Sequence, residues 1–590
     1  MTTSRRSTTG LPAVLARAPR LGLFVAAGLA VCTLPALADM SDTVDRTGLR
    51  SLSGSFLAAR HAGNLKDLDS AAAFYKRALA ADPGNEVLLD RTVMMLVASG
   101  AIPEAVDLAD DLAEADPSNQ LAALTLAVSA LQEGETDKAR EALVPLANGS
   151  PLPELTAALL TAWSYVADDD IDSALAALDD LEGPDWYKAF TVRHAGLILD
   201  MAGRHEEAVE RLEEAFEADP RALRGLDAVA RAAARAGNRD KAQDIVAEFA
   251  ETSGEHPLVI QLQEQLASSD PVAPQIETAH AGAAEALFDL GVAVGQDGGE
   301  EYAAGYLQLA IHLGPDTSMP AFSLASLHES MQQHEQAIAV YRTIPETSPL
   351  SRSAKVQIGL NLNAIDKVDA AKAQLEPLVD EDPSDLSAIV ALGNVMRSHD
   401  DFAGAREVYS KGLATLDEPG REHWTLFYFR GIANERLDRW PEAEADFKTA
   451  LELYPDQPLV LNYLGYSWID KGMHLEEGLD MIQEAVNQRP NDGFIVDSLG
   501  WAYYRLGRYE DAVEELERAV SLQPNDPVIN DHLGDAYWQV GRKLEANFQW
   551  SHARDLDPEP DDLADILQKL EHGLQEEQTD AASVAEPSDQ

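Results

Sequence analysis

Apolar and small side chains recur along this chain with a period of about 34 residues. In the clearest unit, Val496, Leu499 and Tyr503 share one side of a first predicted helix, and Leu516 and Ala519 share one side of a second. Spacings of three and four residues are typical of an amphipathic helix, and 34 residues accommodate two short helices with two turns. The pattern therefore predicts a helical hairpin that is repeated along the chain.

A small residue marks the same place in every repeat. It recurs at steps of 34 or 35 residues, with one step of 38 and one gap of 61. The series is Ala71, Ala105, Ala139, Ala174, Ala208, Ala242, Ala303, Ala337, Ala371, Ala405, Ala443, Gly478, Ala512 and Ala546. A hairpin cannot bury its apolar face alone and must stack on its neighbours. We therefore predict an all-α fold, an α-solenoid of about fourteen hairpins in two superhelical arrays.

Two further positions punctuate each repeat. A second small residue stands twelve positions before the first, as at Gly500, and allows two helix backbones to approach closely. A proline stands twelve positions after the first small residue, as Pro83 does after Ala71. Because proline cannot continue a helix, it predicts the border between two hairpins. An aspartate often precedes that proline, as at Asp82, where we expect it to cap the next helix.

This pattern resembles the tetratricopeptide repeat (TPR). The unit with Val496, Leu499, Gly500, Tyr503, Ala512, Leu516, Ala519 and Pro524 matches the family signature at every position, and the next unit is similar. The resemblance covers nearly all of the chain after residue 50. It implies stacked helical hairpins, and a fold alone says little about function.

The repeats divide the chain into segments. We predict a signal peptide at 1–38, an N-terminal array of about six repeats at 39–256, and a degenerate repeat with a proline-containing junction at 257–283. A C-terminal array of about eight repeats is predicted at 284–558, a capping helix at 559–574, and a disordered acidic tail at 575–590.

The first 38 residues have the pattern of an export signal. Four arginines accompany a short apolar run at residues 21–31, and Ala36-Leu37-Ala38 offers a small-x-small cleavage site. The alternatives are a retained membrane anchor, for which the run is short, and a lipid anchor at Cys32, for which the preceding Val31 is too bulky. We expect an exported, periplasmic protein, with association with the outer membrane as the alternative.

Composition excludes several classes of function. The chain has 101 acidic residues against 45 basic ones, so a nucleic-acid partner, which needs a basic face, is not expected. No phosphate-binding loop and no serine-nucleophile motif is present, and Cys32 is the only cysteine. We therefore expect no catalytic residue, no metal, no cofactor and no small-molecule substrate.

Aromatic side chains gather in the C-terminal repeats. Six of the eight tryptophans lie between Trp424 and Trp550. Trp468, Tyr503, Tyr537 and Trp550 fall on packing positions. Other aromatic residues form a second stripe that we expect to face the inside of the superhelix. This predicted partner-binding groove consists of Tyr428, Tyr466, Phe494, Asp497, Trp501, Tyr504, Arg505, Asp531, Asp535 and Trp538. The alternative is that these rings pack between successive repeats.

The sequence thus favours a non-enzymatic scaffold or adaptor that binds a protein or peptide in this groove. Residues 491–520 are similar to exported proteobacterial repeat proteins, some of which are adaptors of carboxyl-terminal-processing proteases. That resemblance implies a role in turnover or assembly of the cell envelope. An assembly factor for secreted polysaccharide or outer-membrane components is the alternative. TPR domains that clamp a terminal carboxylate use lysine and asparagine where this chain has aspartates, so that ligand is not expected.

Overall fold

The computed structural model describes residues 51–147, 150–253, 256–296, 298–314 and 318–574. The predicted signal peptide and the predicted acidic tail lie outside these residues. The described residues form thirty α-helices and two short 3-10 helices, and no strand occurs among them. Among the same residues, no helix is both long and apolar enough to cross a bilayer.

The helices follow one another in antiparallel pairs. The first thirteen are α2 (Leu52–Asn64), α3 (Leu68–Ala81), α4 (Glu86–Ala98), α5 (Ile102–Ala115), α6 (Gln120–Gln132), α7 (Thr136–Ala147), α8 (Pro151–Ala167), α9 (Ile171–Asp179), α10 (Lys188–Met201), α11 (His205–Ala218), α12 (Leu223–Arg235), α13 (Arg239–Ser253) and α14 (Pro257–Ala267). The 3-10 helix η2 (Asp185–Tyr187) precedes α10.

Among the described helices, α14 has no partner helix in a pair of its own. The series then continues after it. It comprises α15 (Ala279–Gln296), α16 (Glu300–Leu313), α17 (Ser318–Ser330), α18 (His334–Tyr341), α19 (Ser351–Ala364), α20 (Val368–Glu381), α21 (Leu386–Ser398), α22 (Phe402–Leu413), η3 (Arg421–His423), α23 (Trp424–Arg436), α24 (Trp440–Leu453), α25 (Pro458–Asp470), α26 (Leu475–Gln488), α27 (Gly493–Arg505), α28 (Tyr509–Leu522), α29 (Pro527–Gln539), α30 (Lys543–Asp555) and α31 (Pro560–His572).

The small residues lie where the helices of a hairpin cross. All thirteen repeating alanines are fully buried, as in Ala105 and Ala512. The second small residue also lies close to the partner helix. A Cβ added at Gly500 of α27 would lie 2.5 Å from Leu516 Cγ of α28. The α-solenoid is therefore confirmed, and its repeat is set by the closeness of the two backbones.

The helix caps differ from the expectation. Asp82 lies at the carboxyl end of α3, and the amino end of α4 is capped by Asn85, whose side chain accepts from the Leu88 N–H. The same shift of three residues occurs in a later repeat, where Asp382 ends α20 and Asp385 caps α21. The proline lies in the turn between them, so the aspartate before it belongs to the preceding helix.

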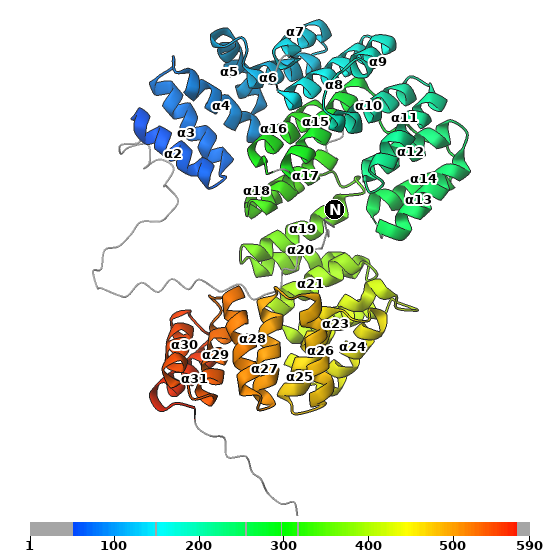
Figure 1. Cartoon of the computed structure of the whole chain (residues 1–590). Coiled ribbons are helices and arrows are strands. Elements are labelled where there is room, and N and C mark those ends of the chain that lie inside the picture. Colours follow the sequence, from blue (N-terminus) through cyan, green and yellow to red (C-terminus); the bar gives the residue numbers. More distant parts are fainter. Residues whose placement is uncertain (1–50, 148–149, 254–255, 297, 315–317, 575–590) are drawn as a thin grey trace, which may run out of the picture.

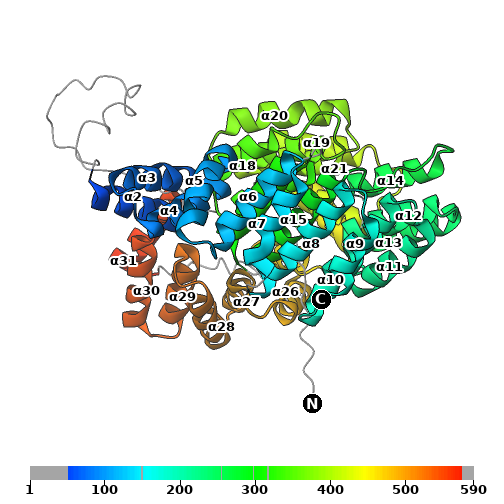
Figure 2. The same cartoon turned by 90° about the horizontal axis from the view of Figure 1, so that it is seen from above.

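The chain forms two successive arcs. Helices α2–α14 curve around α15–α18, which lie inside the first arc, and α19–α31 form a second arc below it (Figure 1). Contacts agree with this view, since α15 packs against α8 and α10 and α16 packs against α4 and α6. Seen from above, α15 lies behind α6–α8 (Figure 2).

Hydrophobic packing crosses the predicted junction at 257–283. One continuous apolar core extends from Ala59 to Leu324, because α15 and α16 fill the inside of the first arc. After it, smaller clusters overlap from repeat to repeat, for example from Leu461 to Ile529 and from Ala512 to Ile566. Helix α31 lies where a capping helix is predicted and packs on α30.

Candidate functional site

In the first arc, the first helix of a hairpin faces inward, since α4 and α6 contact α16 and α8 and α10 contact α15. We compare the side chains on this side of the helix at fixed places in the repeat. Relative to the small residue of that helix, they lie six and three positions before it and one, four and five after it. We call these five positions the inner stripe. In α27, counted from Gly500, they are Phe494, Asp497, Trp501, Tyr504 and Arg505. In α12, counted from Ala230, they are Arg224, Asp227, Arg231, Ala234 and Arg235.

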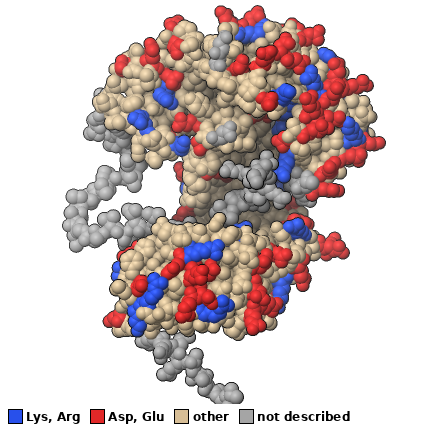
Figure 3. All heavy atoms as spheres, viewed as in Figure 1, with Lys and Arg blue, Asp and Glu red and all other residues tan. Residues whose placement is uncertain are grey.

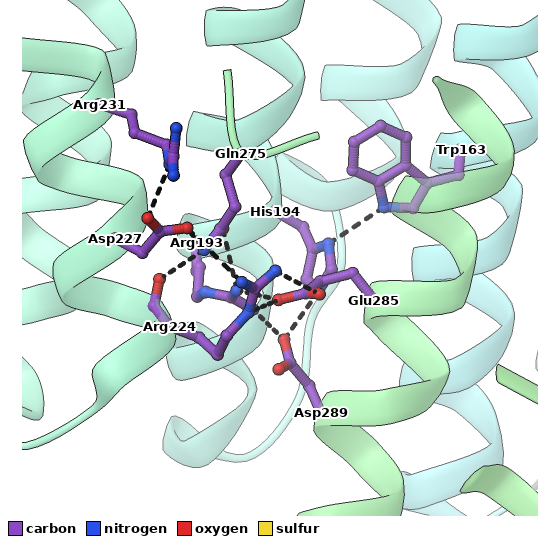
Figure 4. Close-up of polar contacts among 9 residues, drawn as sticks. All are labelled: Trp163, Arg193, His194, Arg224, Asp227, Arg231, Gln275, Glu285 and Asp289. Atoms are coloured by element: carbon purple, nitrogen blue, oxygen red, sulfur yellow. Dashed lines mark hydrogen bonds and ion pairs between the residues drawn. The ribbon is translucent and has the colours of Figure 1, made fainter. Parts of the chain in front are cut away.

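The inner stripe of the first arc is occupied by the chain itself. Arg224 of α12 forms a bidentate pair with Glu285 of α15, with N–O distances of 2.9 and 2.8 Å. Arg193 of α10 donates to the same carboxylate and to Asp289 (Figure 4). Burial would raise the pKa of Glu285, but the two guanidinium groups lower it far below its ordinary value. These ion pairs hold α15 in place.

A histidine adds a neutral link to this network. The indole N–H of Trp163 in α8 donates to His194 Nδ1 at 3.0 Å, and His194 Nε2 lies 3.2 Å from an Asp289 oxygen. Because Nδ1 accepts, the ring proton is on Nε2 and is donated to Asp289. The ring of Trp163 leaves no room beside Gly282, where an added Cβ would lie 2.2 Å from it. Helix α15 therefore fits against α8 only through a glycine.

A segment without regular secondary structure, residues 268–278, connects α14 to α15 and contacts α12. Arg235 Nη1 donates to the Val272 carbonyl at 3.2 Å, and Arg231 Nη1 donates to the Ala273 carbonyl at 3.3 Å. Arg239 of α13 donates to the carbonyl of Asp270 at 2.7 Å. Val272 and Ile276 are buried. Arg231 and Arg235 of the α12 inner stripe thus hold this segment through its carbonyl oxygens.

The second arc shows no such occupant among its described helices. Helix α27 packs against α25, α26, α28 and α29, which are its neighbours in the sequence. Its inner stripe exposes 39% of Phe494 and leaves Trp501 and Tyr504 half-buried. The rings of Trp501 and Tyr504 stack at 4.7 Å with an angle of 10° between them. Phe494, Trp501, Tyr504 and Arg505 therefore form an accessible aromatic surface with one cation.

Some residues of the predicted groove instead form contacts between successive repeats. The Trp501 ring also stacks on His532 of α29 at 4.1 Å, and His532 Nδ1 lies 3.0 Å from buried Asp497. Burial alone would lower the pKa of His532, but the Asp497 carboxylate outweighs it and raises that pKa. Asp497 was expected to face a partner, and the structure instead places it in a contact between α27 and α29.

The aspartates of the last repeat are likewise internal. Lys569 of α31 pairs with Asp531 at 2.6 Å and with Asp535 at 2.9 Å, and Asp535 also accepts from the Trp550 indole. Burial and the neighbouring Asp531 carboxylate raise the pKa of Asp535 to about 6. The expectation that both carboxylates face a free groove is therefore wrong, because helix α31 supplies a cation that neutralises them.

The remaining predicted groove residues are also packed. Tyr428 of α23 is buried among the aromatic rings of Phe429, Phe447 and Tyr463, so it is core. Tyr466 is half-buried, and burial, helped by the nearby Asp497 carboxylate, raises its pKa well above the ordinary value for tyrosine. Trp538 is half-buried against Gly573, which follows α31.

Charge on the surface matches the composition. Acidic side chains outnumber basic ones on the face seen in Figure 3, most densely over the outer helices near α11–α13. Within the described part of the chain, no group of three or more histidine, aspartate or glutamate side chains is placed to hold a metal ion.

The filling of the first arc is the feature that the sequence reasoning missed. The sequence feature that could have revealed it was a row of arginines on one side of a helix in a strongly acidic chain, namely Arg224, Arg231 and Arg235. Such a row needs an anionic or carbonyl-rich counterpart. Glu285 and Asp289, spaced to share one face of α15, provide it.

Comparisons with known proteins agree with this architecture. Models of the TPR repeat match residues 500–541, and models of the tetratricopeptide repeat match residues 95–151 and 399–458. A TPR repeat-containing protein of Pseudomonas aeruginosa is 26% identical over 192 residues, which is 32% of each chain. The match thus spans about a third of that relative.

Two solved structures also align with this chain. The APC/C hetero-tetramer Cut9–Hcn1 aligns over 90% of this chain and 98% of that one, with 14% identity and a TM-score of 0.38. A tetratricopeptide repeat protein from Parabacteroides merdae aligns over 49% of this chain and 98% of its own, with 14% identity and a TM-score of 0.33. Together with the hairpins and their small-residue crossings, the repeat matches show that this chain contains tetratricopeptide repeats.

Proposed function

We propose that this protein is a non-enzymatic scaffold that binds a protein or peptide partner on the inner face of its second arc. The observation that carries the proposal is the contrast between the two arcs. The inner stripe of α12 is covered by residues 268–278 and α15, whereas the inner stripe of α27 has no occupant among the described residues. A face that the fold fills in one arc and leaves open in the other is suited to an external partner.

The composition of that face supports a protein partner. Rigid aromatic rings contribute much binding energy for little loss of conformational freedom, and they are typical of the central residues of protein interfaces. Phe494, Trp501 and Tyr504 provide such rings, and Arg505 provides a charged donor beside them.

We further propose that the scaffold is exported and acts in turnover or assembly of the cell envelope. The pattern of residues 1–38 supports export, and the similarity of residues 491–520 to exported repeat proteins supports the envelope role.

Site-specific photo-crosslinking tests the groove. A benzoylphenylalanine at position 494 or 504 places the reactive group on the inner stripe, and one at position 544 places it on an outer side chain that is 82% exposed. We expect a discrete protein adduct in cells from 494 and 504 and none from 544. Equal adducts from all three positions, or none from the first two, would contradict the proposal.

A further inference from the structure

A cavity of about 370 Å³ lies at the start of the first arc, between α2, α3, α4 and α16. Phe56, Tyr75 and Met95 line it, and the side chains of Tyr75 and Met95 are buried. The rings of Phe56 and Tyr75 meet edge to face, with their centroids 6.2 Å apart. The cavity therefore has an apolar floor. At about 30 Å³ for each water-sized group, its volume holds roughly twelve such groups.

Helix α16 sets the end of this cavity. It packs against α4 and α6, which places it over the inner side of the helices that follow α2 (Figure 1). Lys66, in the turn after α2, also pairs with Glu300 at the start of α16, with an N–O distance of 3.5 Å. A ligand must therefore fit within the cavity, since it cannot continue along the inner side of the later helices.

Two arginines line the cavity without an ion-pair partner. Arg60 of α2 and Arg91 of α4 are both exposed, and within the described part of the chain neither guanidinium group pairs with a carboxylate. In contrast, Arg224 of α12 pairs with Glu285. Among the described residues that line the cavity, Glu301 of α16 is the only acidic one. Two guanidinium groups against one carboxylate leave the cavity with a net charge of +1, in a chain whose net charge is −56.

Tyr75 adds a third hydrogen-bond donor. Its hydroxyl group has no hydrogen-bond partner among the residues that the structure describes. Burial raises the pKa of Tyr75, although the nearby Arg91 and Arg60 oppose the rise. The hydroxyl group therefore keeps its proton at neutral pH and can donate a hydrogen bond. The cavity thus combines two charged donors and one neutral donor with an apolar floor.

This combination selects for a particular kind of small molecule. A guanidinium group binds a carboxylate through two parallel N–H donors, and two such groups can share one anionic head. Phe56 and Tyr75 provide flat apolar surface, and the flexible thioether of Met95 adapts to an alkyl chain. A neutral ligand would leave both guanidinium groups without an anion, and a long peptide would exceed the space.

We propose that this cavity binds a small amphipathic carboxylate whose anionic head lies between Arg60 and Arg91. Its hydrocarbon chain packs on Phe56, Tyr75 and Met95. All but one of the lining residues come from the first two hairpins of the first arc, so the site is separate from the partner-binding surface proposed for α27. The ligand is held and not converted, so the site requires none of the catalytic motifs that the sequence lacks.

Calorimetric titration of the full chain with decanoate tests the proposal. Decanoate matches the volume of the cavity. Two other probes separate its charge from its chain. The diol 1,2-decanediol has the same carbons and oxygens as decanoate without the charge, whereas butyrate keeps the charge and lacks most of the chain.

Four protein variants alter the charge or the space. Arg60→Met removes one guanidinium group, and Arg77→Met is its matched control, because Arg77 lies over the Phe74 ring and does not line the cavity. Gly63→Phe adds a ring at a lining position where an added Cβ has nothing within 4 Å, and it keeps both arginines. Glu301→Gln removes the one carboxylate.

We expect saturable binding of decanoate, weakened about tenfold by Arg60→Met and unchanged by Arg77→Met. Gly63→Phe should abolish binding because its ring occupies the cavity. Glu301→Gln should strengthen binding about threefold because it removes a repelling charge. A loss of structure cannot strengthen binding, so this variant separates an effect on the site from an effect on folding. The diol and butyrate should each bind about tenfold more weakly than decanoate.

Three outcomes would overturn the proposal. They are an absence of saturable binding, equal binding of decanoate and the diol, and decanoate affinities that are equal in Arg60→Met, Gly63→Phe and the control. Tighter binding of the tetrapeptide acetyl-Gly-Gly-Gly-Leu, which has a terminal carboxylate on a polar main chain, would also overturn it and assign the cavity to a peptide. The crosslinking test at positions 494 and 504 concerns the second arc, so its result is independent of these outcomes.

Discussion

At Gly500, where the two helices of a hairpin cross, there is no room for one additional methyl group. An alanine at position 500 would bring its Cβ to 2.5 Å from Leu516 Cγ and 3.2 Å from the Leu516 main-chain nitrogen. We expect Gly500→Ala to lower the free energy of unfolding by about 1–3 kcal/mol, measured by urea denaturation. Gly63→Ala in α2 is the control, because nothing lies within 4 Å of the added methyl group. That variant should be neutral or more stable by up to about 1 kcal/mol; similar losses for both would show that the crossing is not tightly packed.

Protonation of His532 should make the C-terminal repeats more stable in mild acid. The Asp497 carboxylate raises the pKa of His532 above its ordinary 6.5. A raised pKa in the folded state gives stability that is fully present below pH 6.5 and is lost as the pH rises through the folded value. We expect the urea midpoint, followed by tryptophan fluorescence, to fall as the pH is raised from 6.5 to 8.5. The His532→Gln and Asp497→Asn variants should lose this dependence, and its persistence in both would point to another group.

The capping helix is attached through one buried cation. Lys569 lies between Asp531 and Asp535, and all three side chains are less than a fifth exposed. Lys569→Met leaves two largely buried carboxylates without their cation, which we expect to cost about 3–5 kcal/mol and to speed hydrogen exchange in α29 and α30. Lys543→Met is the control, since that side chain only covers the Trp538 ring. Exchange that is equally slow in the Lys569 variant would mean that apolar contacts alone hold α31.

At the scale of helices, the sequence was sufficient to predict the features that a single repeat determines by itself. The hairpins, the buried alanines and the packing roles of Trp468, Tyr537 and Trp550 follow from the 34-residue pattern. The inner stripe of α27 was predicted as a set, but pattern alone does not show which of its members meet the next repeat. Asp497 and Trp501 contact His532, which is 35 and 31 residues away, and helical periodicity within α27 carries no information on that contact.

Contacts between distant repeats were beyond prediction for the same reason. Helix α15 carries an ordinary crossing glycine, Gly291, and fits the repeat register as well as any other helix. Its place inside the first arc depends on Glu285 meeting Arg193, 92 residues earlier, and on Gly282 lying against Trp163. A superhelix returns to itself only after several repeats, so such pairs arise from the curvature of the whole molecule.

The whole molecule depends on the ion pairs that fix α15 within the first arc. Glu285 is nearly buried and neutralises Arg193 and Arg224, which are also shielded from water. Glu285→Leu leaves two guanidinium groups without that carboxylate, and we expect a loss of about 3–5 kcal/mol together with faster hydrogen exchange in α10, α12 and α15. Glu300→Gln on neighbouring α16 is the control, because its pair with Lys66 is about one-third exposed and should contribute less than about 1 kcal/mol. If α15 leaves the arc, the radius of gyration from X-ray scattering should rise in the Glu285 variant alone. An unchanged radius with slow exchange would show that the apolar core from Ala59 to Leu324 holds α15 without its charges.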